Sequence, residues 1–260
     1  MVASKWQSSR TTKHMYQLGE GWPTLHEIDA LVHLSSVLFI FAATAVKFIQ
    51  DESYSDPQGQ LACLLSTIAT STSSSHQLLD QLYLQVLNNA YPDVSTDLTC
   101  RLKIALGSIV LLRSPLSPLD IEQLLGLNIP LHRTLQHFPL YPTTNGEAIH
   151  PIHSSFCDFL TDPAQCSNQA FLINPEMLHS LLAQTCLTSL KMLKRDICEI
   201  KQPWIVHSEV ENLPELVQQH ISPILQYACS HWATHLSCGL LSDRLLDSLE
   251  EFCTHTFCTG

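Results

Sequence analysis

Apolar residues recur at spacings of three and four along most of this sequence, which is the pattern of helices that bury one face. The pattern is clear in residues 24–50, 78–87, 102–112, 175–193 and 216–236. Of the 260 residues, 45% are apolar and 14% are charged, so the chain has enough apolar side chains to build hydrophobic cores. The sequence therefore predicts a mostly α-helical fold.

Changes in this pattern divide the chain into four predicted segments. Residues 1–20 are polar and are predicted to form a flexible tail, and residues 21–95 a helical subdomain that begins with a capping box at Thr24. Residues 96–165 are predicted to form a winged-helix domain with a small β-hairpin. Residues 166–260 return to the helical pattern and are predicted to form a C-terminal helical domain.

The winged-helix prediction depends on three helices in a row. After the apolar helix of residues 102–112, Ser117 is a predicted N-cap with Pro118 at the first helical position. This short helix is expected to stop at Gly126, and a third helix to begin after Pro130.

A small β-hairpin is expected after these helices. Asn145-Gly146 is a turn signal between two short runs, Leu140–Tyr141 and Ala148–Ile152, that fit strands. Three helices followed by a hairpin is the order of elements in a winged helix.

The net charge argues against nucleic acid as a partner, and the length of the apolar segments argues against a membrane. Thirteen Lys and Arg against 24 Asp and Glu give a net charge of −11, which repels phosphate backbones. The most apolar window, residues 37–46, is about half as long as a membrane span, and the N-terminus lacks the apolar stretch of a secretory signal. The cysteines are scattered with no C-x-x-C pair, as in a reducing compartment, so a cytoplasmic location is predicted.

No enzyme chemistry is predicted from the motifs. No Lys follows a Gly, so a phosphate-binding loop of the Walker type is absent, and no local signature pairs a Cys with a His. His231 and His235 lie one helical turn apart near Cys229, but the Glu and the third ligand of a zinc helix are missing. A packing or surface role is favoured for them over metal binding, so no catalytic residue, metal or cofactor is predicted.

His153 immediately precedes a predicted helix that carries Phe156, Phe159 and Leu160. The two phenylalanines are expected to be buried against residues 106–112. If their packing holds the histidine with its ring outward, a ring N–H can donate a hydrogen bond to a phosphate oxygen. From the spacing alone, an ordinary histidine beside a helix cap is the favoured interpretation, and phosphate sensing is the alternative.

A series of longer motifs resembles a known family. Residues 106–117 (LGSIVLLRSPLS), 153–162 (HSSFCDFLTD), 194–198 (KRDIC) and 225–236 (LQYACSHWATHL) look like the region that follows the nucleotide-binding core in fungal NACHT proteins, the NLR-like STAND family. Upstream of these motifs, Gly21-Trp-Pro, residues 38–49 (LFIFAATAVKFI) and residues 79–83 (LDQLY) resemble the helical subdomain of that family. The resemblance covers nearly the whole chain.

The resemblance implies a non-catalytic regulatory and structural arm of a signalling ATPase, a fragment of a nucleotide-state switch. In such proteins an upstream domain binds nucleotide, the winged helix closes over it, and WD40 or other repeats sense a ligand. The family's contact to the nucleotide phosphate corresponds to His153. The implied partner is a NACHT nucleotide-binding domain, in the same protein or another chain, together with a repeat domain. An independent winged-helix adaptor or DNA-binding regulator is the alternative function.

The isolated chain is predicted neither to bind nor to hydrolyse ATP. It has no loop to hold the β- and γ-phosphates, and one histidine hydrogen bond contributes about 1 to 3 kcal/mol, against roughly 8 kcal/mol for micromolar affinity. Isothermal titration calorimetry with MgATP is expected to give no signal. Micromolar affinity would contradict this prediction.

Overall fold

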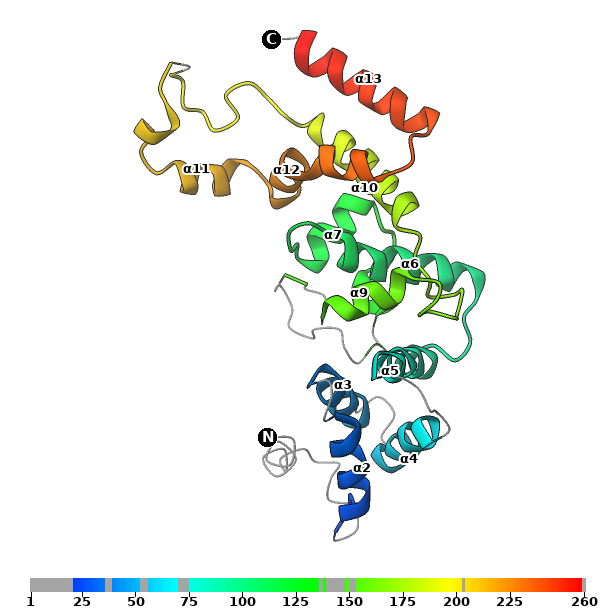
Figure 1. The fold of residues 1–260 in the computed structure, drawn as a ribbon. Coiled ribbons are helices and arrows are strands. Elements are labelled where there is room, and N and C mark those ends of the chain that lie inside the picture. Colours follow the sequence, from blue (N-terminus) through cyan, green and yellow to red (C-terminus); the bar gives the residue numbers. More distant parts are fainter. Residues whose placement is uncertain are drawn as a thin grey trace. The chain divides into compact units, whose positions relative to one another are not determined.

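The computed structural model describes residues 21–35, 39–51, 56–69, 75–135, 138, 148–149, 153–202 and 204–258. Every regular element in these ranges is a helix, so the predicted mostly α-helical class is confirmed (Figure 1). No helix in the described ranges has the length and apolar character needed to cross a membrane.

The chain divides into two compact units. The first takes its described residues from 1–99, 135–142 and 152–172, and the second from 100–134, 143–151 and 173–260. Both units are therefore assembled from segments that lie far apart in the sequence. Residues 96–165, the predicted winged-helix segment, contribute to both.

The described part of the first unit contains five complete helices (Figure 1). A capping box starts the first of them: the Thr24 backbone N–H donates to Glu27 Oε2 at 2.8 Å, and the Glu27 N–H donates to Thr24 Oγ1 at 3.3 Å. The helices are α2 (Leu25–Ser35), α3 (Phe39–Ile49), α4 (Pro57–Ala69), α5 (Ser75–Ala90) and α9 (Ser154–Thr161).

Helix α9 packs on α5 through aromatic rings. The Tyr83 ring of α5 lies 5.0 Å from the Phe156 ring and 5.5 Å from the Phe159 ring, and Phe138 stacks on Phe156 at 5.6 Å. The predicted burial of the two phenylalanines is confirmed. Their aromatic partners are Tyr83 and Phe138, whereas the expected partner, residues 106–112, belongs to the second unit.

The second unit begins with most of α6 (Thr96–Leu111) and with α7 (Pro118–Leu125). The predicted limits of α7 are confirmed: Ser117 Oγ accepts the Asp120 N–H, Pro118 occupies the first position, and Gly126 ends the helix in the left-handed conformation at φ 61°. The other helices are α8 (Leu131–Thr134), α10 (Pro175–Leu190), the short 3₁₀ helix η2 (His207–Glu209), α11 (Leu213–His220), α12 (Pro223–Cys238) and α13 (Asp243–Cys258).

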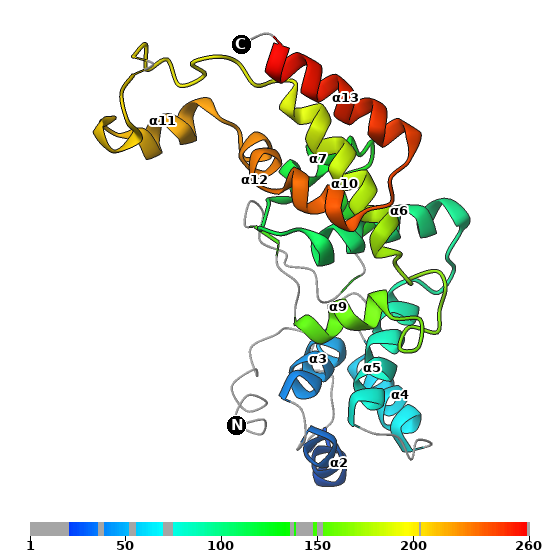
Figure 2. The same cartoon turned by 45° about the horizontal axis from the view of Figure 1, so that its top comes forward.

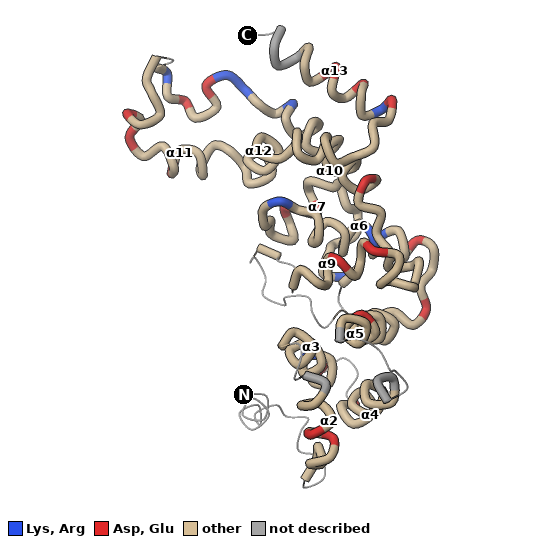
Figure 3. Tube along the Cα trace, in the orientation of Figure 1, with Lys and Arg blue, Asp and Glu red and all other residues tan. Residues whose placement is uncertain are grey.

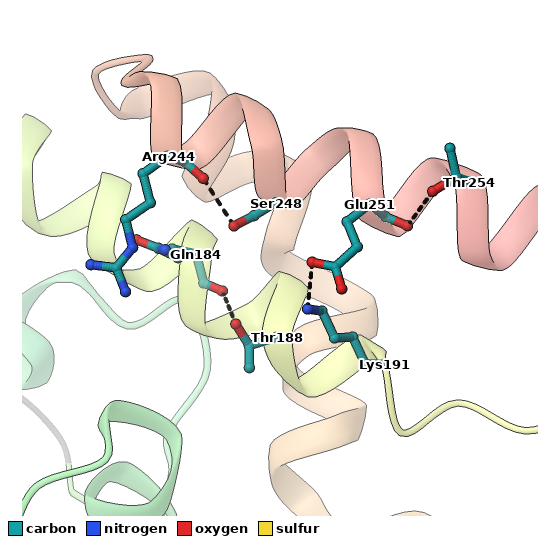
Figure 4. Close-up of polar contacts among 7 residues, drawn as sticks. All are labelled: Gln184, Thr188, Lys191, Arg244, Ser248, Glu251 and Thr254. Atoms are coloured by element: carbon teal, nitrogen blue, oxygen red, sulfur yellow. Dashed lines mark hydrogen bonds and ion pairs between the residues drawn. The ribbon is translucent and has the colours of Figure 1, made fainter.

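Helices α10 and α12 lie side by side in both Figure 1 and Figure 2 and form the centre of the second unit. The turn after α12 is tied to α10, because Ser180 Oγ accepts the Leu240 N–H at 2.7 Å. A Cβ on Gly239 would lie 2.8 Å from the Ser180 backbone nitrogen, so only glycine fits this approach. Helix α13 is joined to α10 by an ion pair between Lys191 and Glu251 at 2.6 Å (Figure 4).

One sequence prediction differs from this fold, and a second is not supported by it. Residues 216–236 form parts of two helices instead of one, because Pro223 cannot continue α11 and instead occupies the first turn of α12, where Ser222 is the N-cap.

The predicted β-hairpin at residues 140–152 lies outside the described residues except for Ala148 and Ile149, and the described part of the chain supplies no strand to support it. The Ile149 N–H donates to the Leu116 carbonyl at 3.0 Å.

Replacing Phe156 by alanine is expected to lower the free energy of unfolding of the first unit by about 3 to 5 kcal/mol, because it empties a buried aromatic site. Phe39→Ala is the matched control, since the Phe39 side chain is 67% exposed and its loss should change stability by no more than about 0.5 kcal/mol. Urea unfolding measures both. Equal effects of the two substitutions would contradict the packing of α9 on α5.

Candidate functional site

His153, the predicted phosphate sensor, is the N-cap of α9. Its Nδ1 accepts the backbone N–H of Ser155 at 3.2 Å, and the Ser155 hydroxyl oxygen lies 2.9 Å from the same nitrogen. The side chain is exposed. The histidine is therefore the N-cap itself and not a residue beside a cap. Its Nδ1 is occupied by hydrogen bonds within the protein.

The hydrogen bonds continue from His153 into the core. The Tyr83 hydroxyl lies 3.0 Å from Ser155 Oγ, and Tyr83 is fully buried. Burial raises the pKa of the Tyr83 phenol, an effect that the hydrogen bond to Ser155 opposes, so the phenol keeps its proton at neutral pH. Three side chains therefore connect the core of the first unit to an imidazole at its surface.

The charged side chains in the described part of the first unit are mainly negative. Among the described residues of the first unit, the only Lys or Arg is Lys47, whereas Asp158 and Asp162 lie in or directly after α9 itself. Figure 3 shows red segments on α2, α5 and α9. The described part of the first unit therefore does not supply the several cations that usually bind a phosphate group.

A second polar cluster lies inside the second unit and includes one residue that the sequence analysis did not single out, His179. Its Nδ1 lies 2.8 Å from Nδ1 of His235, and Nε2 of His235 lies 2.6 Å from the Tyr227 hydroxyl. That hydroxyl also accepts the Arg113 backbone N–H at 3.2 Å. The cluster joins α10, α12 and the segment that follows α6. At its centre, the side chain of His235 is fully buried.

The donors and acceptors of this cluster run in one direction. Because Tyr227 accepts from Arg113, its own proton is free for Nε2 of His235, and Nδ1–H of His235 can then donate to His179. Burial is the main cause that lowers the pKa of His235 to about 4, with further lowering by His179, Arg113 and His231. Burial and Arg113 also lower the pKa of His179. Both imidazoles are therefore neutral at pH 7.

This geometry leaves no metal site at His231 and His235. His231 Nε2 lies 3.2 Å from Ser114 Oγ, while both nitrogens of His235 are used by Tyr227 and His179. Within the described residues, no three His, Cys, Asp or Glu side chains are placed to hold a metal ion. The predicted packing role fits these contacts. The nine cysteines whose side chains are described, Cys229 among them, are free thiols.

The sequence analysis did not name His179 or Tyr83 as site residues, although the position of each on an apolar helical face is a signal in the sequence. His179 lies between Leu178 and Leu182 on the buried face of α10, and Tyr83 follows Leu82 on the buried face of α5. A polar side chain on an apolar helical face needs an internal partner, but the pattern does not say which residue provides it.

Comparison with known proteins gives no relative: no family model matches the sequence, and neither a curated protein nor a solved structure matches it.

The second unit is expected to lose stability in acid. His235 has a folded-state pKa of about 4 against an ordinary 6.5, so between these values the unfolded chain binds more protons and stability falls as pH falls. The expected loss from pH 7 to pH 5 is about 2 kcal/mol, measured by hydrogen exchange of α12 amides.

His235→Gln is expected to be less stable at pH 7 but to lose less stability on acidification. His207→Gln, at an exposed position of the same unit, is the control and should keep the wild-type slope. An unchanged slope in His235→Gln would show that another group causes the acid sensitivity.

Proposed function

We propose that this chain is the non-catalytic regulatory arm of a NACHT-type STAND signalling ATPase. In this proposal it closes over a nucleotide held by a domain that these residues do not encode, and His153 senses the nucleotide phosphate. The resemblance of residues 106–117, 153–162, 194–198 and 225–236 to that family motivates the proposal. The observation that carries it is the geometry of His153.

That geometry leaves a hydrogen-bond donor at the surface. Since Nδ1 accepts the Ser155 N–H, the proton of the neutral ring is on Nε2. The imidazole is exposed, and its cap bond restrains the ring. A restrained N–H donor suits recognition of a phosphate oxygen that another domain presents.

The surroundings of His153 favour a sensing role over a complete binding site. With Lys47 as its only Lys or Arg, the described part of the first unit lacks the several cations that hold di- and triphosphates. We therefore propose no catalytic residue and no resident cofactor. The proposed partners are a NACHT nucleotide-binding domain and a WD40 or other repeat domain, and the proposed location is the cytoplasm.

DNA binding by a winged helix, the alternative function, has less support. The third helix of that arrangement, α8, spans Leu131–Thr134, which is about 6 Å of helix and too short to lie along a major groove. Its only Lys or Arg is Arg133, and the chain has a net charge of −11. We propose no nucleic-acid partner.

The test is to join the chain behind a related NACHT ATPase domain and to compare ADP release with and without His153→Ala. Loss of a phosphate hydrogen bond of about 1.5 to 3 kcal/mol is expected to speed ADP release and to shift the closed state toward the open state by roughly 10- to 150-fold. Self-association should rise in parallel.

His26→Ala is the control, because His26 is an exposed histidine on α2 of the same unit. The thermal stability of His26→Ala should remain close to wild type. His153→Ala also removes the N-cap of α9 and should lower the free energy of unfolding by about 0.5 to 2 kcal/mol. Unchanged ADP release in His153→Ala would remove the sensing role and leave a structural one.

A further inference from the structure

We infer that Tyr83 and Ser155 are positioning residues for His153, and that they tie presentation of its Nε2–H to the packing of α9 on α5. This inference rests on the function proposed above and extends it to residues that touch no nucleotide. The juxtaposition that carries it is a chain of hydroxyl contacts between side chains 72 residues apart in the sequence.

The direction of these hydrogen bonds follows from one fixed donor. The backbone N–H of Ser155 points at Nδ1 of His153, so this nitrogen presents its lone pair. Ser155 Oγ lies 2.9 Å from the same nitrogen, a distance that two acceptors would not keep, so the serine hydroxyl donates to the imidazole. Its oxygen is then the acceptor for the Tyr83 hydroxyl at 3.0 Å.

Tyr83 is placed to hold this chain of hydrogen bonds rigidly. Its ring is fully buried between Phe156 and Phe159, the two aromatic residues that fasten α9 to α5. A phenol in this position cannot turn away while the helices stay packed. If α9 separates from α5, Ser155 Oγ loses the Tyr83 donor, and the His153 ring keeps only its two contacts with Ser155, neither of which is then fixed by the core.

A structural change in α5 can therefore alter the orientation of the His153 ring without any substitution of His153. Packing of α9 on α5 restrains the exposed donor, and loss of that packing frees the ring to turn. The ordered donor is then the state that retains nucleotide, and the mobile donor is the state that releases it.

The test uses substitutions that remove one hydroxyl each. Tyr83→Phe keeps the ring between Phe156 and Phe159 but removes the donor, and Ser155→Ala removes the link. Tyr91→Phe is the matched control, because Tyr91 is a buried tyrosine at the end of α5 whose ring packs on Phe171. In the isolated full chain, NMR relaxation of the His153 ring should show greater mobility in the first two variants and no change in Tyr91→Phe. An unchanged ring in Tyr83→Phe would overturn the inference.

A double-mutant cycle in the fusion with a NACHT ATPase domain then tests the functional link. Tyr83→Phe is expected to speed ADP release about 3- to 10-fold when His153 is present, and to add nothing in the His153→Ala background. Equal acceleration in both backgrounds would assign Tyr83 a purely structural role and overturn the inference.

The two proposals fail in different ways. If His153→Ala itself leaves ADP release unchanged, the sensing function fails, while the NMR comparison still decides whether Tyr83 and Ser155 position the ring.

Discussion

Two polar side chains buried in the helical cores, Tyr83 and His235, find hydrogen-bond partners inside the packing, and in each unit these bonds connect two helices. An unpaired buried donor or acceptor costs about 1 to 3 kcal/mol, a large share of the stability of a small domain. Tyr83 is paired with Ser155 of α9, and His235 with His179 of α10 and Tyr227 of its own helix. Aromatic and aliphatic packing supplies the bulk of the contact area, but it would tolerate several alignments of the same helices. The hydrogen bonds select one.

The two polar clusters differ in where they end. The chain from Tyr83 ends at His153, an exposed imidazole, so a change in the core can alter a group that faces solvent. The cluster at His235 is closed at its centre, with both nitrogens of that ring bonded inside the unit. The first arrangement suits recognition of a ligand brought by another domain. The second suits holding α10 against α12. It makes the unit less stable in acid, because burial above all lowers the pKa of His235.

The charge distribution is the reason that we propose a regulatory arm instead of a self-sufficient nucleotide-binding protein. An imidazole N–H is a single donor, whereas polyphosphate sites combine cations, backbone amides and a metal ion. Beside His153, α9 carries Asp158, and the described part of the first unit offers Lys47 as its only Lys or Arg. A contact of this kind adds a modest increment to binding that is dominated by another domain. Such an increment is the size that shifts an equilibrium between two conformations.

Features that depend on residues a few positions apart could be predicted from the sequence alone. The capping box at Thr24, the α7 cap at Ser117 and its stop at Gly126 were predictable, because N-caps and left-handed C-caps are satisfied within one helical turn. Burial of Phe156 and Phe159 followed from the apolar face of a helix. The candidate site was predictable only as far as His153 itself. Tertiary structure decided that Tyr83 is the partner of that helix, that His179 pairs with His235 across 56 residues, and that the chain divides into units assembled from distant segments. Periodicity marks which face of a helix is buried but carries no information about which other face covers it, so these pairings depend on how the whole chain packs.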